Sequence, residues 1–141
     1  MARQVTPLPK GRTKPKRGQT AASLKRKATT LHSMVVRARA GYRCERCGTT
    51  DGQLQCAHIV SRRFTATRCD PEAAWCLCAA DHRFLTENPH EHVAFAVATR
   101  GEDGYRTLID KAYAGRGLVM SAAFWKERVD ALQAELDGLT R

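Results

Sequence analysis

Apolar residues at helical spacing predict the first ordered element of the chain. After residue 20, apolar positions alternate with lysine and arginine in a pattern typical of an amphipathic helix. We expect this helix to begin at Ala21 and to end near Gly41, because glycine often follows the last turn of a helix. The residues on its apolar face are Leu24, Leu31, Met34, Val35 and Ala38.

Helical spacing returns in the second half of the chain. It covers residues 82–87, 90–99, 105–113 and 121–136. Pro89 is expected to end the first of these helices, since proline disrupts a helix interior. Ser121 is a candidate N-cap and Gly138 a candidate stop for the last helix. We expect that helix to pack on the domain through its apolar face.

Between these helical regions lies a loop-rich segment, residues 42–88, that contains all six cysteines. Its turn signals are Cys47-Gly48, Asp51-Gly52 and Asp70-Pro71. Residues 54–60 are the best strand candidate, with a length that suits one arm of a short hairpin. The pattern therefore predicts an α+β fold: one small domain over residues 21–141 with a helical C-terminal extension.

Positive charge is concentrated at the N-terminus. Residues 1–43 contain 12 Lys and Arg and no Asp or Glu, so the other 98 residues carry 12 basic and 14 acidic side chains. Residues 1–20 combine this charge with Pro and Gly and have little to bury, which predicts a disordered basic arm. Such an arm is attracted to a phosphate backbone, and DNA is therefore the expected partner. A solvated tail that serves solubility is the alternative.

Membrane and export signals are not apparent in the sequence. No apolar run approaches the roughly 20 residues that cross a bilayer, and no signal-peptide core follows the basic N-terminus. We expect a soluble cytoplasmic protein without a membrane partner. In such a reducing compartment, cysteines indicate metal binding more than disulfides.

The clearest chemical motif is Cys44-x-x-Cys47 followed by Gly48. Two thiolates at this spacing can share one tetrahedral zinc ion, and the glycine gives the turn its backbone freedom. Cys78 and Asp81 stand at the spacing where a second pair would complete the site, and a carboxylate oxygen is a known zinc ligand. Other thiols that remain candidates for the fourth ligand are Cys56, Cys69 and Cys76, and buried apolar packing is the alternative role of Cys56 and Cys69.

Several motifs occur together in one order between residues 31 and 113. They are VRAR at 36–39, the Cys44–Cys47 pair, LQCAHIVSRR at 54–63, RCDP at 68–71 and LCAADH at 77–82. In this combination the chain resembles the HNH, or ββα-metal, endonucleases with a CxxC…CxxC zinc site, particularly the small bacteriophage ones. The resemblance implies a zinc-stabilised ββα-metal core with flanking helices. It also implies a bacterial or phage-infected cell, with phage packaging or recombination proteins as partners.

The resemblance assigns roles to individual residues. It implies that His58 is the general base for hydrolysis of DNA phosphodiesters, and that His82 ligates a catalytic divalent cation such as Mg²⁺, Mn²⁺, Ni²⁺ or Zn²⁺. An imidazole suits the first role, because its neutral form accepts a proton near pH 7. A divalent ion suits the reaction, because it stabilises charge that develops on the phosphate. The candidate phosphate contacts are Arg62, Arg63 and Arg68.

Three positions depart from the family pattern. Ala57 stands where a metal-binding Asp or His is usual, Ala73 where the central Asn is expected, and Asp81 where the fourth cysteine is expected. The residues that could replace the missing metal ligand are Asp70, Cys56, His90 and His92, although the two last are more typical of a helix surface. His32 is expected to be structural or exposed.

Three functions are therefore compared. The first is a metal-dependent DNA endonuclease that uses His58 and His82. The second is a DNA-binding protein that keeps the HNH scaffold with weak or no cleavage, as Ala57 and Ala73 suggest. The third is a zinc-stabilised adaptor that binds proteins through its C-terminal helix, and it gives the basic arm no role.

Overall fold

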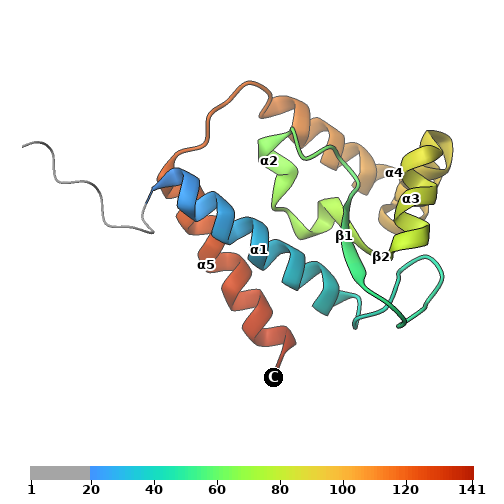
Figure 1. Cartoon of the computed structure of the whole chain (residues 1–141). Helices are drawn as coiled ribbons and strands as arrows, with labels where there is room; N and C mark the ends of the chain where they lie inside the picture. Colours follow the sequence, from blue (N-terminus) through green and yellow to red (C-terminus); the bar gives the residue numbers. More distant parts are fainter. Residues whose placement is uncertain (1–19) are drawn as a thin grey trace, which may run out of the picture.

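The computed structural model describes residues 20–141 and consists of helices around one short hairpin (Figure 1). The expected disordered arm, residues 1–20, lies outside the described residues except for Thr20. The elements in chain order are α1 (Ala21–Arg39), β1 (Leu54–His58), α2 (Thr65–Arg68), the 3-10 turn η1 (Pro71–Ala73), β2 (Ala74–Cys78), α3 (Ala79–Glu87), α4 (Pro89–Ala114) and α5 (Ala122–Leu139). The predicted α+β class is confirmed.

The antiparallel hairpin of β1 and β2 separates two sets of side chains. Cys56 pairs with Cys76, and Ala57 pairs with Trp75. Because successive side chains in a strand point to opposite faces, the two pairs lie on different faces of the hairpin. The buried Cys76 packs with Val36 of α1, so the first face is turned toward α1.

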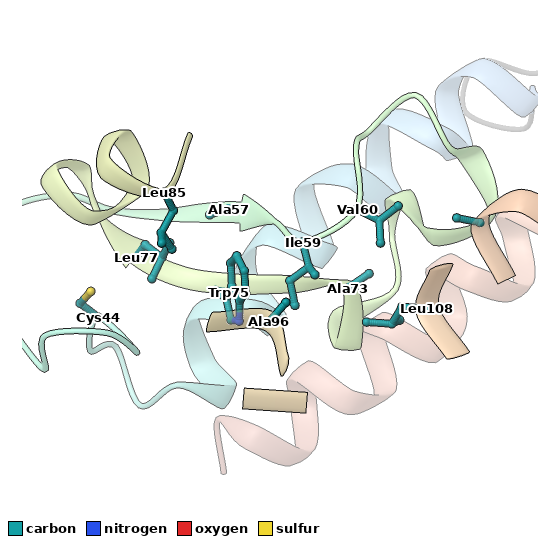
Figure 2. Close-up of a cluster of buried hydrophobic side chains, with 11 residues drawn as sticks. Cys44, Ala57, Ile59, Val60, Ala73, Trp75, Leu77, Leu85, Ala96 and Leu108 are labelled. Carbon is teal, nitrogen blue, oxygen red and sulfur yellow. The ribbon is translucent and has the colours of Figure 1, made fainter. Parts of the chain in front are cut away.

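The second face of the hairpin carries the main core, which α3 and α4 cover (Figures 1 and 2). Trp75 is fully buried there and packs with Ala57, Leu85 of α3 and Ala96 of α4. Its indole Nε1–H donates a 2.9 Å hydrogen bond to the Thr99 hydroxyl. This hydrogen bond offsets the cost of removing the indole N–H from water, so burial of the large apolar ring stabilises the core.

A separate apolar cluster joins α1 to α5, which lie side by side (Figure 1). Leu24, Leu31 and Val35 of α1 pack with Val129 and Leu132 of α5. The prediction that the last helix packs on the domain is confirmed, and its apolar face is therefore not free for a protein partner. Met34, which was expected on the apolar face of α1, is instead 40% exposed.

Most helix ends agree with the sequence signals. Gly41 follows α1 with a φ of 64°, which glycine adopts without strain. The Ser121 hydroxyl accepts a 3.1 Å hydrogen bond from the Phe124 N–H and caps α5. Gly138 does not stop that helix, which continues to Leu139. One glycine costs a helix only about 1 kcal/mol, and the buried Leu136 holds the last turn in place.

Two other elements differ from the expectation. α3 begins at Ala79, three residues before the predicted start, because the Cys78 sulfur accepts from the Asp81 N–H and caps it. The predicted helices 90–99 and 105–113 are both present in α4, which Gly101 interrupts with a φ of 75° and a ψ of 163°. Of the helices in residues 20–141, none is sufficiently long and apolar to span a membrane.

We predict that Leu132→Ala lowers the free energy of unfolding by about 2–5 kcal/mol, because Leu132 is only 1% exposed between α1 and α5. Chemical denaturation of the full chain measures this change. The matched control is Leu139→Ala in the same helix, where the side chain is 42% exposed and the expected change is below about 0.5 kcal/mol. Equal effects of the two substitutions would contradict the α1–α5 packing.

Candidate metal centre and active site

The predicted zinc ligands Cys44, Cys47, Cys78 and Asp81 come together in the structure. One potential ligand atom from each lies within 4.8 Å of all the others. Cys44 and Cys47 lie in the loop after α1, and a turn closes between them and Gly48, whose N–H donates a 2.9 Å hydrogen bond to the Cys44 carbonyl. Cys78 ends β2 and Asp81 lies in the first turn of α3.

The interatomic distances in this group fit a tetrahedral ion. The sulfurs of Cys47 and Cys78 are 3.8 Å apart, and Oδ2 of Asp81 is 3.2 Å from the Cys44 sulfur and 3.5 Å from the Cys78 sulfur. Zinc–sulfur bonds of about 2.3 Å at tetrahedral angles place two sulfurs roughly 3.8 Å apart. The group can therefore hold a metal ion such as zinc.

Arg46 holds the carboxylate of this group in its orientation. Its Nη1 donates a 2.6 Å hydrogen bond to Oδ1 of Asp81, which leaves Oδ2 directed at the sulfurs. Burial alone would raise the pKa of Asp81, but hydrogen bonds from Cys47, Cys44 and Arg46 outweigh it and lower the pKa. Such outer contacts fix the geometry of a ligand, and the positive charge of Arg46 offsets part of the charge of three thiolates and a carboxylate.

The other three cysteines lie outside this group. Cys69 is buried in the α1–α5 cluster, and Cys76 is buried between the hairpin and α1. Cys56 lies two residues before His58 on β1. All six cysteines are free thiols. Asp81 therefore occupies the position of the fourth ligand beside the three predicted cysteine ligands. None of the other three thiols lies in this group.

His58, the predicted base, lies in a second group of ligand atoms that the sequence analysis did not identify. His32 of α1, Cys56 and His58 each place one potential ligand atom within 4.8 Å of the others. Cys56 and His58 share the hairpin face turned toward α1, because they are two residues apart in β1. Burial lowers the pKa of His58 to about 4 and also lowers the pKa of His32.

His32 was expected to be either structural or exposed. It is only 1% exposed, so the second alternative is wrong. Its Nε2 is 3.0 Å from the Asp70 carbonyl oxygen. It lies one turn before Val36, which contacts the same hairpin face. The sequence holds a partial signal, a histidine on the apolar side of the helix, but only the fold brings it to Cys56.

His82 has different surroundings. Its Nδ1 is 2.7 Å from Oε1 of Gln55, which is adjacent to Cys56 and therefore points to the opposite face of β1. Among residues 20–141, His82 belongs to neither group of three or more potential ligands. The residues present thus do not form a ligand set for a divalent ion around His82, and its catalytic role stays a prediction.

Two of the three positions that depart from the family pattern, Ala57 and Ala73, belong to the apolar core. Ala57 and Ala73 are 2% and 0% exposed. Of the residues suggested as replacement ligands, Asp70 binds Lys111 at 2.7 Å and caps η1, and His90 is exposed. His92 contacts the backbone of His58, with its Nε2 3.4 Å from the His58 carbonyl oxygen.

The predicted phosphate contacts surround the turn after β1. Arg62 and Arg63 are exposed, and Arg68 is half-buried. Arg68 lines a hollow of about 500 Å³ together with Ala22, Lys25, Arg26, Thr29 and Thr30 of α1. Its Nε is buried and has no hydrogen-bond partner within the described part of the chain. A buried donor without an acceptor costs stability, so a hydrogen-bond acceptor at this position would stabilise the protein.

Comparison of the chain with protein-family models, with curated proteins and with solved structures gives no match.

We predict that Cys47→Ser loses the metal ion of the Cys44, Cys47, Cys78 and Asp81 group. Cys47 is exposed, so the loss of stability that follows reflects the metal rather than packing. Metal analysis of the purified protein and thermal unfolding with and without EDTA measure both effects. Cys69→Ser is the control and keeps the ion; an unchanged metal content in Cys47→Ser would refute the ligand assignment.

Proposed function

We propose that the chain is a zinc-stabilised, metal-dependent DNA endonuclease that hydrolyses phosphodiester bonds. The observation that carries this proposal is the contact of His58 with the backbone of Arg68, whose side chain lines a basic hollow. His58 Nε2 is 3.1 Å from the Arg68 carbonyl oxygen, and the side chain of Arg68 lines the hollow with Lys25 and Arg26. The candidate base is therefore held by the backbone of a residue whose side chain belongs to a group of basic side chains.

His58 is oriented for proton transfer. A carbonyl oxygen can only accept a hydrogen bond, so Nε2 of His58 carries the proton and Nδ1 keeps its lone pair. In the proposed reaction Nδ1 takes a proton from water as the new P–O bond forms. The P–O bond to the sugar oxygen then breaks, and that oxygen takes a proton from solvent. A divalent ion supplies charge stabilisation at the phosphate when bound.

The basic side chains supply DNA affinity in this proposal. Lys25 and Arg26 lie on α1, while Arg62 and Arg63 are exposed after β1. Each phosphate contact releases condensed counterions, so affinity is expected to fall steeply with salt. DNA binding and a phage setting stay predictions, and the second depends on the HNH resemblance alone.

We predict that the purified protein nicks supercoiled plasmid in the presence of Mg²⁺, Mn²⁺ or Ni²⁺ and not in EDTA. His58→Ala is expected to lower the rate by at least about 100-fold, the usual contribution of a general base. His90→Ala is the control, because His90 is exposed on α4. Equal rates in the two variants would remove His58 from the mechanism.

A second candidate function is DNA binding without cleavage. It is favoured by the buried Ala57 and Ala73 and by the position of His82 on the opposite face of β1 from His58. This candidate keeps the structural zinc and the basic hollow and has no reacting centre. Absence of plasmid nicking with every ion, together with salt-sensitive DNA binding, would favour it.

We predict that the double substitution Arg62→Gln and Arg63→Gln reduces the slope of log affinity against log salt by about 2, one for each lost phosphate contact. Fluorescence anisotropy with a duplex oligonucleotide over a series of salt concentrations measures it. The control is Arg106→Gln, an exposed arginine of α4. An unchanged slope in the double variant would exclude both arginines from the DNA interface.

A further inference from the structure

We propose that His32, Cys56 and His58 form a second metal centre, with two imidazole nitrogens and one thiolate as protein ligands. It is distinct from the group of Cys44, Cys47, Cys78 and Asp81, since the two groups share no residue. The inference concerns metal binding and stands whether or not the chain cleaves DNA.

The distances fit the expected coordination. Nδ1 of His32 is 3.7 Å from the sulfur of Cys56, and the three ligand atoms of the group lie within 4.8 Å of one another. Zinc–sulfur bonds of about 2.3 Å and zinc–nitrogen bonds of 2.0–2.1 Å at a tetrahedral angle place such a pair roughly 3.6 Å apart. The His32–Cys56 pair therefore already has the separation that a shared ion requires, and the ligand atom of His58 lies within 4.8 Å of both.

Both imidazoles are oriented for coordination by backbone carbonyls. Nε2 of His32 donates to the Asp70 oxygen at 3.0 Å, and Nε2 of His58 donates to the Arg68 oxygen at 3.1 Å. This leaves Nδ1 of each ring as the nitrogen with a free lone pair. A histidine ligand usually makes such a bond with its second nitrogen, which fixes the tautomer. Here one short segment, residues 68–70, orients both rings.

The three residues are held by rigid elements. His32 is buried on α1, which the α1–α5 cluster holds in place, and Cys56 and His58 lie on paired β1. The rings of His32 and His58 are 5.4 Å apart between centroids, tilted by 33°. Ligands on helices and strands keep their relative positions better than ligands on loops.

The donor set selects the type of ion. Two imidazoles and a thiolate suit Zn²⁺, Co²⁺ or Ni²⁺, whereas Mg²⁺ requires oxygen ligands, which this group lacks. Three protein ligands leave the fourth tetrahedral position open, as in catalytic rather than structural zinc sites. Arg68, whose carbonyl oxygen orients the His58 ring, also lines the basic hollow with its side chain.

This centre changes the role of His58. A lone pair on Nδ1 that binds a metal ion cannot also accept a proton. In the metal-loaded protein His58 is therefore a ligand, and any hydrolysis there depends on the ion for the activation of water. Loss of cleavage in His58→Ala is expected under both roles, so metal binding has to be measured directly.

The experiment is metal analysis and native mass spectrometry of the full chain after equilibration with Zn²⁺ and removal of free ion, without DNA. The wild type is expected to hold two ions, one for each group, and Cys56→Ser and His58→Gln one. Cys69→Ser is the matched control and keeps both, because Cys69 belongs to neither group. Cys47→Ser is expected to lose the other ion, which identifies the site that each variant affects.

A measurement on the wild-type chain tests the same metal centre without relying on variants that could fail to fold. The ¹⁵N resonances of the His32 and His58 rings are expected to change at Nδ1, and not at Nε2, when the second equivalent of Zn²⁺ is added. The proposal would be overturned by a single bound ion in the wild type or by two ions in Cys56→Ser. Imidazole resonances that do not change when the second equivalent of Zn²⁺ is added would also overturn it. None of these outcomes depends on nuclease activity.

Discussion

The antiparallel pairing of β1 with β2 decides which chemical groups of this chain can meet. Its register, with Cys56 opposite Cys76 and Ala57 opposite Trp75, directs alternate side chains to α1 and to the core under α3 and α4. A shift of one residue would exchange the two faces and bury the wrong side chains. Trp75, fully buried on the core face, therefore fixes the position of Cys56 and His58 on the other.

The hairpin also separates the two groups of potential ligands. Cys78 lies at one end, opposite Leu54, and His58 lies at the other end, opposite Ala74. Strands of five residues span roughly 13 Å between these ends. The group that includes Cys78 ties the loop after α1 to α3, whereas the group that includes His58 ties α1 to the hairpin. A metal ion in each would thus add a link between elements that already pack through apolar side chains.

Much of this arrangement could be predicted from local patterns. Periodicity predicted α1 to within about two residues and the start of α5 to within one, although α5 continues three residues beyond its predicted end. The spacing of Cys44, Cys47, Cys78 and Asp81 identified a group that the fold brings together. β2 was not predicted as a strand, because a short run that is buried throughout has no alternation to distinguish it from a buried helix.

The environment of His58 could not be predicted from spacing alone. His32 is 26 positions before His58 in the sequence, and only the packing of α1 across the hairpin brings the two rings within 5.4 Å between centroids. The family resemblance paired His58 with His82, but alternation along β1 places His82, through Gln55, on the opposite face. Residues that meet through tertiary packing leave no periodic signal.

We infer that the hairpin holds a metal ion near each end, with His58 in the second centre. Crystals of the full chain grown with Zn²⁺ and measured at the zinc absorption edge test it most directly. Two anomalous peaks are expected, one among Cys44, Cys47, Cys78 and Asp81 and one among His32, Cys56 and His58. A peak beside His82, or none beside His58, would contradict it.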